Sequence, residues 1–216
     1  YYTNNVDDIT KADIILLPGS KNTLDDLYEL RRNGVAQAIL KASQEGATVM
    51  GICGGYQMMG LEVRDPEGVE GNVRMLPGLG LLPVITTMQG DKVTRQVEFT
   101  FDGTEALCKG YEIHMGESTI SEDGANPFAR IFNTVDKTEY MDGCVRGNTA
   151  GTYMHGIFDG QEFCDSLINV LCARYGITSK SGVRISFDEY KQREYDKLAD
   201  VIRENMDMKY IYEIIG

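Results

Sequence analysis

The stretch "GICGGYQMMG", residues 51–60, places a cysteine where it could act as a nucleophile. Cys53 follows the apolar run "TVMGI", with Gly51 two positions before it and Gly55 two positions after it. A nucleophile elbow has this form: a strand turns sharply into a helix, and the nucleophile lies at the apex. The crowding of the turn requires small residues at both offsets. The pattern favours an exposed nucleophile, and the competing interpretation is a core thiol among small neighbours.

A nucleophilic cysteine needs a base, because at its ordinary pKa of about 8.5 only a few per cent is thiolate at neutral pH. The sequence has two histidines. His155 ends the strand-like "GTYMH", whereas His114 lies in "GYEIHMG" on the same strand face as Glu112. The strand-end position favours His155 as the base. The other interpretation of His114 is a structural histidine with a satisfied hydrogen bond.

Backbone N–H groups near the elbow could stabilise a developing oxyanion. Gly54 would begin the helix after the cysteine, and its N–H would point to where the oxyanion forms; one such donor is commonly worth about a hundred- to a thousandfold in rate. A second donor is expected from the loop of Gly19 and Ser20. A helix N-terminus also favours thiolate over thiol.

The elements that must position these residues read as a βαβ unit. The run "ADIILLPGS" predicts a strand buried on both faces of a parallel sheet. A helix is predicted from Thr23, which can cap it, to Gly34, and a second over residues 35–45. The run "TVMGI" is then the next strand. Because ligands bind at the carboxyl ends of parallel strands, "PGS" and "ICGGY" are expected to meet there.

The rest of the chain alternates strand-like and helical segments. Residues 61–119 predict an antiparallel or mixed extension of the sheet, and "KVTRQVEFTF" has an apolar face. The runs "RIFNTV" and "NTAGTYMHGIF" predict further strands, and "EFCDSLINVLCARYG" an amphipathic helix that ends at Gly176. Residues 186–215 predict a charged helical tail. The apolar face of the strand consists of Val93, Val97, Phe99 and Phe101, and the apolar stripe of the tail of Tyr190, Leu198, Val201 and Ile202.

Composition narrows the classes of function. A net charge of −12 argues against nucleic-acid and anionic-membrane partners. No apolar run approaches the roughly 20 residues of a transmembrane helix. Five cysteines without a C-x-x-C pair indicate a reducing compartment, so a cytoplasmic protein is expected. No ligand spacing for a metal is present. The four cysteines expected to be packing residues are Cys108, Cys144, Cys164 and Cys172.

These motifs together resemble the class I glutamine amidotransferases, and within them the cobalamin-type subgroup to which the cobyric acid synthases belong. The resemblance covers nearly the whole chain through "LLPGSKNT", "GICGGYQMMG", "GLGLLP", "GYEIHMG", "GTYMHGIFD" and "YDKLADVIRENMD". It implies an α/β, flavodoxin-like fold: a central, mostly parallel sheet with helices on both faces and an antiparallel extension. It also implies that residues 1–216 form one glutamine amidotransferase domain.

The resemblance implies a glutaminase reaction. Cys53 would attack the side-chain amide of L-glutamine to give a glutamyl thioester and ammonia, with His155 as base and then acid. The oxyanion donors would be Gly19 and Gly54, and the substrate-binding residues would be Gln57, Ser20 and Tyr56.

The third member of the triad is missing from its usual place. The wider class has Glu two positions after the catalytic histidine, and here that position is Ile157. Glu112 and Asp159 are candidates to orient His155, with His114 as a further auxiliary residue, or nothing orients it.

The resemblance also implies partners outside this chain. The sequence begins without Met, and it is expected to be the C-terminal part of a polypeptide with an ATP-dependent synthetase domain before it. ATP and magnesium would belong to that domain, with no cofactor in this one. The acceptor would be the corrinoid adenosylcobyrinic acid a,c-diamide. Alternatives are a glutamine amidotransferase subunit for a cell-wall lipid precursor, an elbow-cysteine hydrolase, and a non-enzymatic binding module.

Overall fold

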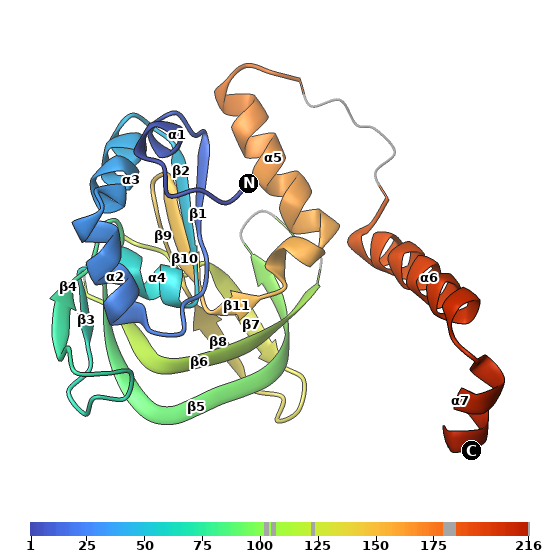
Figure 1. Cartoon of the computed structure of the whole chain (residues 1–216). Coiled ribbons are helices and arrows are strands. Elements are labelled where there is room, and N and C mark those ends of the chain that lie inside the picture. Colours follow the sequence, from blue (N-terminus) through green and yellow to red (C-terminus); the bar gives the residue numbers. More distant parts are fainter. Residues whose placement is uncertain (102–103, 105–106, 122–123, 179–184, 216) are drawn as a thin grey trace. The chain divides into compact units, whose positions relative to one another are not determined.

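A computed structural model describes residues 1–101, 104, 107–121, 124–178 and 185–215 of the chain. The chain divides into two compact units, Tyr1–Gly156 and Ile157–Gly216. The first unit contains two β-sheets with helices beside the first of them, and the second unit is helical (Figure 1). The two units are described separately.

The first sheet is mostly parallel, as the βαβ pattern predicts. Its strand order is β1-β2-β10-β9, in which β1, β2 and β10 run parallel and β9 runs antiparallel to β10. The strands are β1 (Ile14–Leu17), β2 (Thr48–Ile52), β9 (Cys144–Arg146) and β10 (Thr149–Thr152). The mixed α/β class predicted from sequence is therefore confirmed.

The described residues of the first unit include four helices. They are α1 (Val6–Thr10), α2 (Thr23–Arg32), α3 (Val35–Gln44) and α4 (Gly54–Met59). Helices α2 and α3 connect β1 to β2 as expected, but Thr23 is not the cap. Asn22 caps α2 by accepting from the N–H of Asp25 at 3.1 Å. Thr23 points inward instead and donates to Oε1 of Gln57.

Strand β1 is not buried on both faces, as its apolar composition had indicated. Ile15 and Leu17 pack in the core of the first unit, whereas Leu16 on the opposite face is 48% exposed. The pattern of a fully buried strand and that of an edge strand with one open apolar face are the same when every residue is Ile or Leu. Composition alone therefore could not separate them.

The middle of the chain forms a second sheet and not an extension of the first. Its main path is β11-β6-β5-β3-β4, and β7 joins β5 to β8. The long β5 and β6 pair antiparallel, and the predicted apolar face of β5 supplies buried Val97, Phe99 and Phe101. The strands are β3 (Glu62–Arg64), β4 (Met75–Pro77), β5 (Val84–Phe101), β6 (Cys108–Ile120), β7 (Ala129–Asn133), β8 (Glu139–Asp142) and β11 (Met154–His155).

The run "NTAGTYMH" crosses from one sheet to the other. Strand β10 ends at Thr152 in the first sheet, and β11 begins at Met154 in the second, so Tyr153 alone makes the crossing. In β11, His155 pairs with Tyr111 of β6. The crossing places His155 in the second sheet, whereas Cys53 follows β2 of the first sheet.

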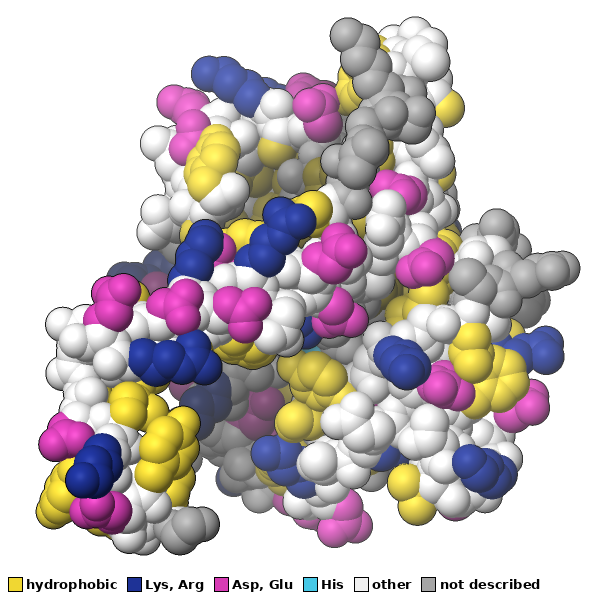
Figure 2. Space-filling view, turned by 90° about the vertical axis from the view of Figure 1, so that its right-hand side faces the viewer, with side chains coloured by type: hydrophobic (Ala, Val, Ile, Leu, Met, Phe, Trp, Pro, Cys, Tyr) yellow, Lys and Arg dark blue, Asp and Glu magenta, His cyan; other side chains and the backbone are white. Residues whose placement is uncertain are grey.

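The second unit consists of helices. They are the 3₁₀ helix η1 (Ile157–Asp159), α5 (Gln161–Arg174), α6 (Phe187–Asn205) and α7 (Met208–Ile215). Helix α5 lies where a helix was predicted, although it ends at Arg174 and its buried side chain is that of Phe163. The predicted tail is two helices. Ser186 caps α6 in a capping box with Glu189. The predicted apolar stripe of α6 is between 38% and 56% exposed, and hydrophobic side chains lie at the surface beside side chains of both charges (Figure 2). Among the described helices, none combines the length and the hydrophobicity that a bilayer crossing needs.

The glycines of the elbow are required by contacts with backbone. A Cβ on Gly51 would lie 2.6 Å from the carbonyl carbon of Gly55, and a Cβ on Gly55 would lie 2.1 Å from the carbonyl oxygen of Leu17. Backbone atoms cannot move aside as a flexible side chain can. The prediction that these positions must be small is confirmed.

We expect Gly55→Ala to lower the free energy of unfolding by about 1–3 kcal/mol or more, because the added methyl group overlaps β1. Gly90→Ala is the matched control, since a Cβ at Gly90 meets no atom within 4 Å. Urea unfolding of both variants measures the effect. Equal stability of the two variants would contradict the packing described here.

Candidate functional site

Cys53 lies at the apex of a sharp turn between β2 and α4. Its backbone has φ 52° and ψ −112°, a conformation that residues other than glycine rarely adopt. Such strain persists only where the surroundings impose it, and it clusters at functional sites. The predicted elbow is confirmed. The side chain is less open than expected, because Cys53 is only 8% exposed.

Burial dominates the electrostatics of the thiol. It raises the pKa of Cys53, the N–H of Gly54 lowers it, and the charges of Glu70 and Asp142 raise it further. The net direction is upward, so the expected preference for thiolate at the helix N-terminus is outweighed in this state. The Sγ atom donates a hydrogen bond to the carbonyl oxygen of Ile113 at 3.5 Å. A base is therefore needed to remove this proton.

The Gly19 loop brings the cysteine and His155 together. A Cβ on Gly19 would lie 3.6 Å from Cε1 of His155 and 3.7 Å from Cβ of Cys53. A Cβ on Gly54 would lie 2.6 Å from the backbone nitrogen of Ser20. The predicted meeting of the two loops at the carboxyl ends of β1 and β2 is confirmed. The roles of Gly19 and Gly54 as oxyanion donors stay predictions.

The ring of His155 has an aromatic neighbour and a free nitrogen. It stacks on Tyr111 with centroids 5.1 Å apart and planes inclined by 9°. Its Nε2 atom is buried and, within the described part of the chain, has no hydrogen-bond partner. The ring is thus placed by stacking, and this nitrogen is held by no carboxylate.

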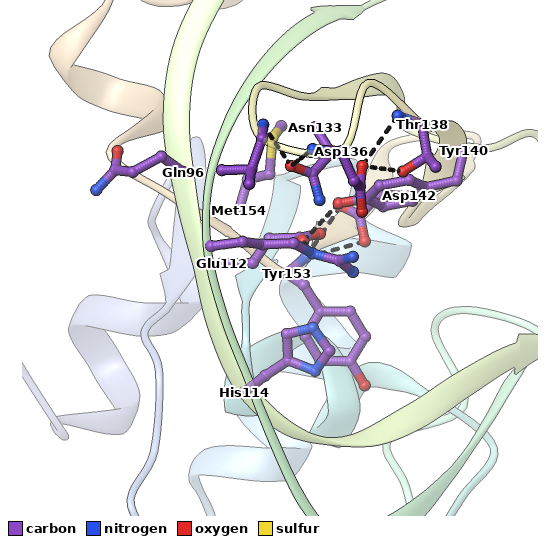
Figure 3. Close-up of polar contacts among 12 residues, drawn as sticks. Gln96, Glu112, His114, Asn133, Asp136, Thr138, Tyr140, Asp142, Tyr153 and Met154 are labelled. Atoms are coloured by element: carbon purple, nitrogen blue, oxygen red, sulfur yellow. Dashed lines mark hydrogen bonds and ion pairs between the residues drawn. The ribbon is translucent and has the colours of Figure 1, made fainter.

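Glu112 is not the residue that orients His155. Its carboxylate is 1% exposed and accepts from Nε of Arg95 at 2.5 Å and from the hydroxyl of Tyr140 at 2.6 Å (Figure 3). Glu112 pairs with Met154, whereas the next pair is Tyr111 with His155. Neighbouring pairs in a sheet point to opposite faces, so this carboxylate faces away from the imidazole.

The remaining candidate acid, Asp159, is the last residue of η1 in the second unit. Its role stays a prediction.

His114 matches the structural interpretation. Its ring stacks on Tyr153 with centroids 3.8 Å apart, and its Nδ1 bonds to the carbonyl oxygen of Gly116 at 3.1 Å. Burial lowers the pKa of His114. These contacts hold the imidazole against Tyr153 (Figure 3).

Gln57 links several elements through the hydrogen bonds of its side-chain amide. Its amide nitrogen donates to the carbonyl oxygen of Met115 at 2.9 Å and to the hydroxyl of Tyr153 at 3.1 Å. Its amide oxygen accepts from the hydroxyl of Thr23 at 3.0 Å. Both amide hydrogens are used in these bonds, and the role of Gln57 in binding substrate stays a prediction. The residue joins α4 to α2, β6 and the sheet crossing.

Ser20 and Tyr56 also have structural partners. The hydroxyl of Ser20 donates to Asp26 at 2.5 Å. Tyr56 is 2% exposed and packs edge-on against Tyr153, with ring centroids 5.3 Å apart. A Cβ on Gly151 would lie 2.2 Å from the ring of Tyr56, so this side chain fills the core over β10. The expected substrate contacts of Ser20 and Tyr56 stay predictions.

Two carboxylates near the site, one buried and one half-buried, were not found from sequence. Asp142 is 7% exposed, and burial raises its pKa to about 6. Glu70 accepts from the N–H of Thr23 at 2.7 Å, and burial raises its pKa as well. Both lie in turns or at strand ends that carry no periodic signal. Glu112, His114 and Asp142 line a cavity of about 450 Å³.

No metal centre is apparent in the part of the chain that the structure describes, where no group of three or more His, Cys, Asp or Glu side chains is placed to hold an ion. The cysteines outside the elbow differ in burial. Cys108 and Cys144 are buried, and Cys164 and Cys172 are half-buried.

Comparison with known proteins identifies relatives across the whole chain. Residues 1–163 match the model of the CobB/CobQ-like glutamine amidotransferase domain. The whole chain aligns with a cobyric acid synthase of Phocaeicola vulgatus at 54% identity and with one of Bacteroides fragilis at 53%, covering 42% of each relative. A cobyric acid synthase of Clostridium botulinum is 39% identical, with 44% covered. The chain thus spans about two fifths of the length of these curated relatives.

Solved structures support the fold. A structure described as a glutamine amidotransferase aligns with a TM-score of 0.56 at 15% identity, over 79% of this chain and 85% of the other. The PurLQS structure from Thermotoga maritima aligns with a TM-score of 0.52 at 20% identity, over 74% of this chain and 80% of the other. At such identities the likeness concerns the fold alone.

The strain at Cys53 predicts an unusual order of stability. Cys53→Gly should be about 1 kcal/mol more stable than Cys53→Ala, because relief of about 1–3 kcal/mol of strain exceeds the roughly 0.5–1 kcal/mol that glycine costs through unfolded-state freedom. The same pair at Cys172, inside α5, is the control and should show the opposite order. Urea unfolding compares the four variants, and a less stable glycine variant at position 53 contradicts the strain.

Asp142 predicts a pH dependence of stability. Its pKa rises from an ordinary 3.8 to about 6 on folding, so the folded state holds a proton that the unfolded state has already lost. The free energy of unfolding should therefore fall as pH rises from 4 to 6, on the order of 2–3 kcal/mol, and stay level above that range. Asp142→Asn should lack this fall. Urea unfolding of both proteins from pH 4 to 7 measures it, and a pH-independent difference between them contradicts the assignment.

Proposed function

The chain belongs to the CobB/CobQ-like glutamine amidotransferase family, and from this membership we propose that it is the glutaminase part of a cobyric acid synthase. The alignment of the whole chain with curated cobyric acid synthases supports the assignment to that enzyme. The observation that carries the chemistry is that Cys53 and His155 both lie against Gly19.

The proposed reaction begins with proton transfer from the thiol of Cys53 to His155. The thiolate attacks the side-chain carbonyl carbon of L-glutamine, and the resulting oxyanion accepts hydrogen bonds from the backbone N–H groups of Gly19 and Gly54. His155 then returns the proton to the leaving nitrogen, which departs as ammonia and leaves a glutamyl thioester. Water, deprotonated by His155, hydrolyses the thioester to glutamate and restores the thiol.

The ammonia would be consumed by the part of the enzyme outside this chain. We assign to that part an ATP-dependent synthetase that uses ATP and magnesium and amidates carboxylates of adenosylcobyrinic acid a,c-diamide. The chain covers 42% of the length of its cobyric acid synthase relatives, which leaves room for such a domain in proteins of that kind. We place the enzyme in the cytoplasm, in keeping with five cysteines that include no C-x-x-C pair.

We expect Cys53→Ala in the whole enzyme to abolish glutamine-dependent amidation while ammonia-dependent amidation continues, because only the supply of ammonia needs the thiol. Cys172→Ala, which removes a half-buried thiol from α5, is the control and should keep both activities. Product formation with glutamine and with ammonium salts is measured for both variants. Loss of both activities in Cys53→Ala, with Cys172→Ala active, contradicts the division of labour.

The alternative of an elbow-cysteine hydrolase has a separate test. A thiol-alkylating glutamine analogue should label Cys53, and L-glutamine should protect the thiol. Labelling that L-glutamine does not slow indicates another substrate.

A further inference from the structure

The position of His155 depends on one residue of chain. Strand β10 runs parallel to β2 in the first sheet and ends at Thr152, and β11 begins at Met154 in the second sheet. A change of backbone angle at Tyr153 would move His155 relative to Cys53. Something must fix the crossing if the imidazole is to stay beside the thiol.

The carboxylate of Asp142 lies at this crossing. It accepts from the hydroxyl of Thr152 and, at 3.1 Å, from the N–H of Tyr153 (Figure 3). The same hydroxyl oxygen of Thr152 accepts from the N–H of Met154 at 3.1 Å. Three consecutive residues before His155 are thus tied, directly or through one hydroxyl, to a single buried acid. We call Asp142 and Thr152, with the two N–H groups they bind, the Asp142 clamp.

The turn after β8 places Asp142 next to the crossing at Tyr153. Gly143 follows Asp142 with φ 73°, and a Cβ there would lie 2.3 Å from the carbonyl oxygen of Gly151. Only glycine permits this approach, so the chain that leaves β8 can pack directly against β10. Thr152 is fully buried and Asp142 nearly so, so water does not compete for these hydrogen bonds.

The side chain of Tyr153 is fixed as well. Its hydroxyl bonds to Gln57 at 3.1 Å and to Ser118 at 2.6 Å, and its ring lies between Tyr56 and His114. Backbone and side chain of the crossing residue are therefore both held. The ring of His155 itself has only the stacking contact with Tyr111 and a buried Nε2 without a partner in the described residues.

We propose that Asp142 is a positioning residue, which holds His155 beside Cys53 through Thr152 and the backbone of Tyr153 and Met154. The clamp replaces a carboxylate on the imidazole: the acid fixes the chain that carries the ring and does not touch the ring. This inference rests on the proposed glutaminase function and adds a residue to its machinery.

Thr152→Val tests the clamp in the whole enzyme, because valine keeps the volume of threonine and removes the hydroxyl. We expect kcat for glutamine hydrolysis to fall about tenfold to a hundredfold, the cost of a displaced catalytic group, with KM within about twofold. Thr152→Ser, which keeps the hydroxyl, should restore most of kcat. Thr149→Val is the matched control, because it removes another buried hydroxyl from the same strand. The hydroxyl of Thr149 donates to the carbonyl oxygens of Leu81 and Arg146 and is not part of the clamp.

A second measurement does not require turnover. The alkylation rate of Cys53 by iodoacetamide is recorded against pH in each variant. Thr152→Val and Asp142→Asn should react about tenfold more slowly at pH 7 than the parent, because the displaced imidazole no longer takes the thiol proton. The rate at high pH, where the thiol ionises unaided, should be unchanged.

The outcomes separate the two hypotheses. Equal losses of kcat in Thr152→Val and Thr149→Val, or alkylation profiles that coincide in all variants, overturn the clamp. A parent enzyme that releases no ammonia from glutamine overturns the proposed function, and the alkylation profile still tests the clamp in that case.

Discussion

The backbone strain at Cys53 is the constraint on which the site depends. A non-glycine residue at φ 52° is held there only if its neighbours leave no alternative. Gly55 rests against the end of β1 and Gly51 against the start of α4, and both contacts are too close for any side chain. The same contacts bring the Gly19 loop against the thiol. One turn therefore fixes Cys53, the proposed nucleophile, and the backbone groups around it together.

The imidazole proposed as the base is positioned independently of the thiol proposed as the nucleophile. Cys53 directly follows β2 of the first sheet, whereas His155 belongs to β11 of the second. Their distance is set by the crossing at Tyr153 and by the buried polar groups around it. Those groups are costly to bury and are tolerated because each finds a partner: Gln57 bonds to Thr23, Met115 and Tyr153. The packing of two sheets thus decides whether thiol and imidazole meet.

Burial has opposite consequences for the two steps of the chemistry. It raises the pKa of Cys53, which opposes formation of the thiolate before substrate binds. It also excludes water, which strengthens the hydrogen bonds that an oxyanion would receive. A buried thiol needs a base that is close and well oriented. The contacts around the crossing at Tyr153 matter for this reason, because they hold the chain that carries His155.

Local signals in the sequence predicted much of the fold around Cys53. The glycine offsets around Cys53 identified the elbow because steric exclusion at a sharp turn acts between near neighbours in the chain. Short apolar runs located β1 and β2, and helix signals located the two helices between them. The same local signals could not separate an edge strand from a central one, so Leu16 was misjudged.

The partners of the polar side chains were decided by tertiary structure. Glu112 and Gln57 have the right types for a site, yet Arg95, Tyr140, Thr23, Met115 and Tyr153 occupy them. Asp142 carried no signal in the sequence, and "NTAGTYMH" read as one strand. A hydrogen bond between residues far apart in the chain depends on how two sheets are registered, which no local pattern records. The sequence determined the turn that carries Cys53, because its glycines act on near neighbours in the chain, and only the folded structure decided which groups surround His155.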